Sequence, residues 1–579
     1  MERGGSAEFS WGAHRRPCYP EAVPYKLFAF VVLIAPSCVA QSSPLLDILK
    51  QELDRNFKIL KEKADPAPYY LSYSVTEEQV ETISGSLGTL QSRNKSASRV
   101  LDVTLRVGSH KLDNYHVVNG DRPRFTTAVL ITQDDNPDAI RRVVWAETDR
   151  IYKLAAQRLI NLKTSTQVNV ADQDKSDDFS TEEPSVSVEP ARKAAAPSDE
   201  WVDKVRRWSG ELSKYNGVLL SNVGVLLQRE TKYMVSTEGT RLQHGRGFAR
   251  ITMVAAGKAS DGMDLQATDS FEAEDPSRLP KEAVVIAAVN RVGKDVTGLL
   301  DAPLVEPFIG PAILSGRASG VFFHEIFGHR IEGHRQKDAN EGQTFTKSVN
   351  SKVLPDFLSV VFDPTRKSIE GVDLNGTYLY DDEGVKARPI TLVDHGVLKT
   401  FLMSRSPVEG FPHSNGHGRR QAGAEVVSRQ SNLIVESEKK VSDAQLRQML
   451  IDEIKRQNKP YGLFFRDITG GYTTTGRRGL QAFKVIPLVV FRVYPDGRPD
   501  ELVRGVDIVG TPLASFARIL ATSDKAEIFN GYCGAESGSV PVSAVSPAIL
   551  VSEIEIQKKE SSRDRPPLLR APVSSGGVQ

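Results

Sequence analysis

Residues 320–330 read GVFFHEIFGHR, an apolar segment with two histidines, His324 and His329, and with Glu325 directly after the first. The pattern is similar to the H-E-x-x-H motif. In that motif two histidines four residues apart bind zinc from one helix face, and the glutamate acts as a base. The segment therefore predicts a helix that carries a metal site.

The spacing of the two histidines differs from that motif, because it is five residues rather than four. In a regular α-helix, side chains four residues apart are separated by about 40° around the axis, and those five apart by about 140°. An undistorted helix therefore cannot direct His324 and His329 at one ion. A π-bulge would realign them, and so would a bend or end of the helix at Gly328. Both distortions remain open at this point.

The N-terminus has the pattern of a secretory signal peptide. Residues 27–35 read LFAFVVLIA, and Pro36 and the segment 38–40, CVA, follow. The apolar run is shorter than the roughly 20 residues that a membrane span requires. We therefore expect residues 1–40 to be a signal peptide and the mature protein to be exported, to a bacterial periplasm or outside the cell. We expect no stable membrane insertion, and a membrane anchor is the alternative.

Export makes the cysteine count informative. The chain has three cysteines, Cys18, Cys38 and Cys533, and cleavage after Ala40 leaves Cys533 alone. The mature chain then cannot form an internal disulfide, so the remaining thiol is buried, paired between chains or used chemically. Burial is the structural alternative, since free cysteine is often found in protein cores.

The composition is that of an ordinary globular protein. Hydrophobic residues make up 40% and charged residues 25% of the 579 residues, which is enough material for domain cores. The 74 basic residues nearly balance the 73 acidic ones, and no basic stripe is present. We therefore expect no nucleic-acid partner.

The hydrophobic periodicity predicts an α+β fold with an N-terminal α+β domain over residues 42–300. Antiparallel strands are expected between its long helices. Those helices are expected at 45–63, 137–162 and 280–300. The segment 168–199 is rich in charged residues, serine and proline, and we expect it to be a flexible loop.

The C-terminal domain is expected over residues 301–558 and should be mostly β, with the helix of the HExxxH motif inside it. A second helix is predicted to begin at Ser442, because Gln445 completes a capping box. The polar, proline-rich residues 559–579 should form a disordered tail.

Several stretches between residues 309 and 557 resemble the TldD/PmbA family of metallopeptidases. They are 310–333, 381–384 followed by 393–398, 415–420, and 531–534 followed by 539–542. The resemblance implies that His324, His329 and Cys533 bind Zn²⁺ and that Glu325 is the catalytic base. All four positions of the family's motif are filled, so the chain is similar to the catalytic, TldD-like type.

The resemblance implies a zinc-dependent peptidase that hydrolyses small or unfolded peptides, with a zinc-bound water activated by Glu325. It also implies a homodimer, or a heterodimer with a family paralogue. The alternative is a non-catalytic interaction subunit of such a complex. A third possibility, a zinc-bearing regulatory protein, follows from the family's association with modulation of DNA gyrase, but export and a neutral charge argue against it.

Some further residues are candidates for roles around the metal. His334 is an alternative third ligand, because some zinc peptidases take a third histidine from the same segment. A thiolate ligand weakens the Lewis acidity of zinc, so an additional donor for the substrate or oxyanion is expected. The candidates are His395, His413, His417 and Arg419. The adjacent acidic residues 381–383 are expected to be structural, since a calcium loop uses alternating positions.

Overall fold

The computed structural model describes residues 43–118, 121–166, 175–190, 199–338, 340–477, 483–509 and 516–559. The predicted signal peptide and the tail beyond residue 559 lie outside these ranges. Within them, no helix combines the length and the apolar composition that crossing a membrane would require.

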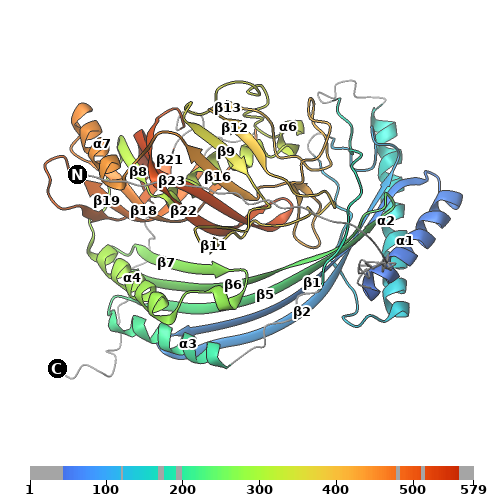
Figure 1. Cartoon of the computed structure of the whole chain (residues 1–579), viewed down its shortest axis with the longest axis horizontal. Helices are drawn as coiled ribbons and strands as arrows, with labels where there is room; N and C mark the ends of the chain where they lie inside the picture. Colours follow the sequence, from blue (N-terminus) through green and yellow to red (C-terminus); the bar gives the residue numbers. More distant parts are fainter. Residues whose placement is uncertain are drawn as a thin grey trace, which may run out of the picture. The chain divides into compact units, whose positions relative to one another are not determined.

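The N-terminal half is built on a sheet that has seven strands among the described residues, in the order β3-β2-β1-β5-β6-β4, with β7 also paired to β6 (Figure 1). Neighbouring strands are antiparallel, except that β4 runs parallel to β6. The strands are β1 (Pro68–Ser86), β2 (Thr89–Val107), β3 (Val129–Leu130), β4 (Val186–Val188), β5 (Leu220–Ser236), β6 (Arg241–Lys258) and β7 (Asp264–Ala273).

Four α-helices cover one face of this sheet. They are α1 (Pro44–Lys63), α2 (Pro137–Thr166), α3 (Glu200–Gly210) and α4 (Glu282–Asp301), with short 3₁₀ turns η1 (Glu211–Lys214) and η2 (Pro276–Arg278). Leu71 and Val75 of β1 pack in one core with α1 and α2, and Ile83 packs in another with α3 and α4. Side chains alternate between faces along a strand, so these odd-numbered residues place all four helices on the same face.

Part of the segment predicted as a flexible loop is ordered, and the prediction was wrong for residues 175–190. This stretch contains β4, and it buries Phe179. The Phe179 ring lies 3.8 Å from the guanidinium carbon of Arg106 and 3.8 Å from that of Arg405. These cation–π contacts involve residues far away in the sequence, so the polar composition of the segment did not reveal them.

The C-terminal half is dominated by a sheet that, in the described part of the chain, has twelve strands. They are β8 (Phe308–Leu314), β9 (Leu358–Phe362), β12 (Ile390–Asp394), β13 (Val397–Leu398), β16 (Asn432–Ser437), β17 (Lys440–Val441), β18 (Gly462–Thr473), β19 (Phe483–Val493), β20 (Glu501–Val503), β21 (Val506–Val509), β22 (Ile519–Ala535) and β23 (Gly538–Lys558). Pairing runs from β23 through β21, β19, β18 and β8 back to β23, so five strands close a ring. Two short ribbons pair β10 (Ser368–Ile369) with β11 (Val372–Asp373), and β14 (Gly418–Arg419) with β15 (Val427–Ser428).

The helix of the histidine motif, α5 (Gly316–Ile326), is the central helix of this half. It packs against β23, β18 and β22, and all its residues except Arg317 are buried. Its apolar side chains, among them Val321, Phe322, Phe323 and Ile326, are covered by this enclosure. After it come the 3₁₀ turn η3 (Gly328–Ile331), α6 (His334–Lys337) and α7 (Asp443–Arg456). The α7 helix begins with the predicted capping box of Ser442 and Gln445.

The predicted α+β fold class is confirmed. The N-terminal half joins long helices to antiparallel strands, and the mostly β C-terminal half carries the motif helix. The chain passes from the first sheet to the second between α4 and β8.

The tryptophans of the N-terminal half provide a test of its core. Trp208 of α3 is 2% exposed, whereas Trp145 of α2 is 54% exposed. We expect Trp208→Ala to lower the free energy of unfolding by about 3–5 kcal/mol, because a large buried side chain is removed. Trp145→Ala should change it by less than about 0.5 kcal/mol. Denaturant unfolding of both variants, followed by circular dichroism, checks this, and equal effects would contradict the assigned core.

Candidate metal centre

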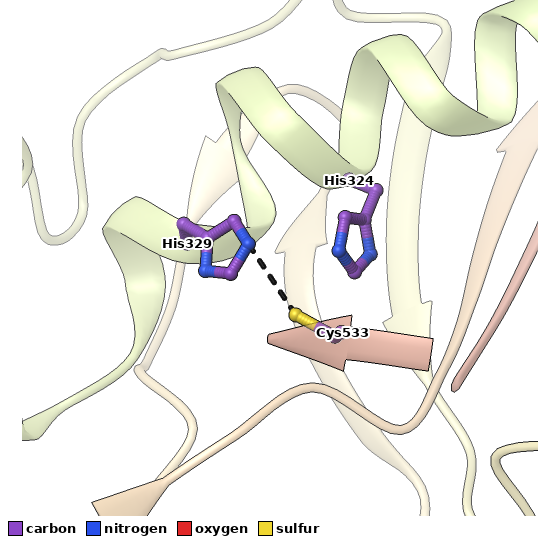
Figure 2. Close-up of side chains that lie close together, drawn as sticks. All are labelled: His324, His329 and Cys533. Carbon is purple, nitrogen blue, oxygen red and sulfur yellow. Dashed lines mark hydrogen bonds between the residues drawn. The ribbon is translucent and has the colours of Figure 1, made fainter. Parts of the chain in front are cut away.

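Three potential ligand atoms from distant parts of the chain converge beside the end of α5. One ring nitrogen each from His324 and His329 and the sulfur of Cys533 lie within 4.8 Å of one another. Figure 2 shows both imidazole rings above the cysteine, with the helix on one side and a strand on the other. The structure thus brings together the three residues that the sequence proposed as ligands.

The end of the helix resolves the five-residue spacing. The α5 helix stops at Ile326, and the chain tightens into the 3₁₀ turn η3 from Gly328 onward. Of the two distortions considered, the chain therefore uses a helix end rather than a π-bulge. A side chain at position 328 would place its Cβ 2.0 Å from Oε1 of Gln430. The turn that reorients His329 lies directly against the Gln430 amide group, so any side chain at position 328 would force one of the two to shift.

The cysteine reaches the helix from the hairpin of β22 and β23. Cys533 pairs with Val540 across this hairpin, and its sulfur points toward the histidines. The distance from Cys533 Sγ to His329 Nε2 is 3.3 Å. Two donors bound tetrahedrally at zinc distances of about 2.0–2.3 Å would be about 3.5 Å apart. The observed distance matches that requirement.

Charge favours a thiolate in this cluster. Burial alone would raise the pKa of the Cys533 thiol, but His329 and His324 lower it well below its usual range. Burial alone would lower the pKa of His329, but Cys533 and Glu332 raise it well above its usual range. A thiolate beside two imidazoles is a donor set that suits zinc, so the residues present fit the metal.

Glu325 lies next to the donor atoms without being one of them. Its carboxylate is 4.0 Å from His329 Nε2. Burial raises the pKa of this carboxyl group, and the nearby His324 and His329 partly offset that shift. A buried carboxylate with a raised pKa is suited to accept and return a proton.

The alternative ligand His334 lies in a different set of contacts. Its Nε2 is hydrogen-bonded to Glu536, and the ring is buried. In this arrangement His334 pairs with a carboxylate of the β22–β23 turn and is not in the donor cluster.

The three other candidate histidines each contact side chains outside the donor cluster. His395 is exposed in the turn between β12 and β13 and contacts Asp394 and Glu438. His413 is an exposed side chain 3.6 Å from Glu182. His417 is fully buried and is hydrogen-bonded to Asn415 and Ser431. No contact described for these three histidines connects them with the donor atoms.

Arg419 lines a cavity that contains none of the three donor residues. It donates hydrogen bonds to the carbonyl oxygens of Gln430 and Pro541. The cavity has a volume of about 420 Å³ and is also lined by Tyr532. Neighbouring side chains of a strand point to opposite faces, so the cavity lies across β22 from Cys533.

Two charged residues beside the ligands were not identified from the sequence. Glu332 contacts His329, and Arg429 donates a hydrogen bond to the carbonyl oxygen of Cys533. Glu332 follows His329 by three residues, a spacing that brings side chains together in a helical turn, so this contact could have been expected. No pattern in the sequence connects Arg429 with position 533.

Residues 309–558 match the family model of the PmbA/TldA metallopeptidase C-terminal domain. The β-rich half with its His-His-Cys cluster is therefore similar to the C-terminal domain of that metallopeptidase family. The match covers 250 of the 579 residues.

Curated relatives show the same similarity. A metalloprotease of Methanocaldococcus jannaschii is 29% identical over 40% of this chain and 47% of its own length. A metalloprotease of Methanothermobacter thermautotrophicus is 25% identical over 64% and 77%. A zinc metalloprotease TldD homolog of Saccharolobus solfataricus is 26% identical over 42% and 51%. The chain thus spans about half the length of two of these three relatives.

Solved structures share the fold. TldE from Thermococcus kodakarensis superposes with a TM-score of 0.58 at 14% identity, over 89% of this chain and 100% of that one. A Thermotoga maritima protein, described as a proposed modulator of a DNA gyrase, gives a TM-score of 0.58 at 14% identity over 88% and 99%. At this identity the likeness concerns the fold alone.

The close approach of Gly328 to Gln430 can be tested by substitution. We expect Gly328→Ala to displace the η3 turn and to weaken zinc binding, because overpacking of a filled site costs about 1–3 kcal/mol. Adding Gln430→Ala should restore binding, since the three nearest contacts of the new methyl group all belong to Gln430. Elemental analysis of zinc per chain is the measurement.

Gly534→Ala is the matched control, because an added Cβ beside Cys533 would meet no atom within 4 Å. Its zinc content should equal that of the unmodified protein. Full zinc in Gly328→Ala would contradict the assigned role of the glycine.

Proposed function

We propose that this protein is a zinc-dependent peptidase. One observation carries the proposal: His324, His329 and Cys533 converge within 4.8 Å, with the Glu325 carboxylate beside them. Two imidazoles and one thiolate would supply three protein donors, the number that catalytic zinc sites commonly use. The metalloprotease names of the relatives support the same reading.

In this proposal the site residues have two roles, which are to bind the metal ion and to transfer a proton. His324, His329 and Cys533 would hold the ion, which when bound would supply a water of lowered pKa and a Lewis acid for the peptide carbonyl. Glu325 would accept the proton of that water on its carboxylate and return it to the leaving amine. The 4.0 Å separation between the Glu325 carboxylate and His329 Nε2 supports a role for Glu325 as base rather than as ligand.

The enclosure of the site bears on the substrate. His324, Glu325, His329 and Cys533 are between 3% and 8% exposed. A folded protein surface cannot reach such groups, whereas an extended chain can enter a narrow opening. We therefore propose small or unfolded peptides as substrates.

The remaining parts of the proposal concern the setting of the enzyme. Export to a periplasm or to the outside follows from the signal pattern in residues 1–40, and a dimer with itself or with a paralogue follows from the family resemblance. A non-catalytic interaction subunit is the alternative function. It predicts a chain that assembles with a partner and never cleaves peptides, with or without zinc.

Two substitutions separate metal binding from chemistry. Glu325→Gln should retain zinc and lower peptide turnover by a factor of about 10²–10⁴, because the general base is lost. Cys533→Ala should lose the metal, since a ligand is removed. The measurements are zinc content and mass-spectrometric digestion of short unstructured peptides, with and without a chelator.

Glu306→Gln is the control, because Glu306 is an exposed carboxylate outside the site; it should keep both zinc and activity. Full zinc in Cys533→Ala would refute the ligand assignment. A zinc-loaded protein that cleaves no peptide would favour the non-catalytic subunit.

A further inference from the structure

A buried carboxylate, that of Glu332, lies between the two segments that supply the ligands. Its Oε2 is 3.4 Å from His329 Nδ1 and accepts a hydrogen bond of 2.9 Å from Arg335 Nε. Its Oε1 is 3.4 Å from Arg429 Nε. Glu332 and Arg429 are both fully buried. One oxygen of this carboxylate therefore contacts both the candidate ligand His329 and Arg335, and the other oxygen faces Arg429.

Arg429 extends this contact to the strand hairpin. Its Nη2 donates a hydrogen bond of 2.6 Å to the carbonyl oxygen of Cys533. Its Nη1 donates to Ser537 Oγ at 2.7 Å and to the carbonyl oxygen of Gly538 at 3.0 Å. A planar guanidinium holds several acceptors in fixed directions. Arg429 thus binds both strands of the hairpin next to its turn. The same guanidinium group also faces the Glu332 carboxylate.

Stability alone does not account for these charges. Removing a carboxylate and a guanidinium from water is costly, and apolar side chains of similar volume often stabilise a protein equally well. However, Glu332 contacts the candidate ligand His329, and Arg429 donates a hydrogen bond to the backbone carbonyl of Cys533. A carboxylate on the far nitrogen of a ligand histidine fixes the tautomer and the ring orientation.

We propose that Glu332 is a positioning residue of the metal centre, which acts together with Arg429 to hold His329 and Cys533 at the separation that one ion requires. The inference rests on the proposed zinc site and adds to it. In this arrangement Glu332 accepts a hydrogen bond from the Nδ1–H group of His329. The other ring nitrogen, Nε2, then faces the sulfur of Cys533 at 3.3 Å. Arg429 keeps the sulfur-bearing hairpin at a fixed distance from the same carboxylate.

Substitution of Glu332 in the full chain tests the proposal. Glu332→Gln should weaken zinc binding by about ten- to hundredfold, the usual effect of losing a carboxylate behind a ligand histidine. Zinc affinity is measured by competition with a chelator. In the cobalt-substituted protein, the thiolate-to-metal absorption band should shift or weaken, because the ligand geometry around the ion changes. A purely structural role would leave that spectrum unchanged.

Asp113→Asn is the matched control for the loss of a buried charge. Asp113 is also fully buried and bonded to an arginine, Arg106, at 2.6 Å, but it lies in the N-terminal half. Both variants should be less stable than the unmodified protein. Only Glu332→Gln should alter zinc affinity and the cobalt spectrum.

Ser537→Ala provides a milder variant that keeps the test valid if Glu332→Gln fails to fold. It removes a single hydrogen bond from Arg429 to the hairpin and should weaken zinc binding several-fold. Zinc affinity and a cobalt spectrum equal to those of the unmodified protein, in Ser537→Ala and in any folded Glu332→Gln, would overturn the proposal. Absence of zinc binding in the unmodified protein would instead refute the proposed function itself.

Discussion

The 3.3 Å approach of His329 Nε2 to Cys533 Sγ connects two segments that are 204 residues apart in the sequence. A single ion can be held only if the helix end and the hairpin stay at that separation, so several other features follow from it. The α5 helix must end at Ile326, because a continued helix would turn His329 away. A side chain at position 328 would have to displace the Gln430 amide group, which fills the space beside the turn. The enclosure of α5 by β-strands then keeps the helix from moving relative to the hairpin.

Much of this arrangement could be predicted from the sequence, and the reason is physical. Long amphipathic helices such as α1 and α2 have a strong periodic signal, and the capping box at Ser442 is local. The candidate ligands could be named because histidine and cysteine are few in this chain and because the stretches around them resemble a known metallopeptidase family. The choice between a π-bulge and a helix end was not accessible, since it depends on how closely Gln430 packs against Gly328. That contact exists only in the folded chain.

The predictions that failed or stayed incomplete concern charged groups with distant partners. Residues 175–190 look solvated by composition, yet Phe179 is held between Arg106 and Arg405. Glu332 and Arg429 are likewise ordinary charged residues in the sequence, and their burial depends on each other. A charge is exposed by default, so its burial can be inferred only when the partner is known. The same reasoning explains why the histidines at 395, 413 and 417 were candidates: their partners Glu438, Glu182 and Ser431 lie elsewhere in the sequence and are not marked by any pattern.

The β22–β23 hairpin presents different residues on its two faces. Cys533, Val540 and Val542 form a small cluster on the face of the histidines, whereas Tyr532, Ser539 and Pro541 line the cavity on the other. Because side chains alternate with a period of two, inserting or deleting one residue in β22 near Cys533 would exchange the faces and turn the sulfur toward the cavity. A change of two residues would preserve the alternation. Insertions or deletions in this part of the strand are therefore compatible with metal binding only when they involve an even number of residues. This restriction comes from the alternation of the strand and not from any single side chain.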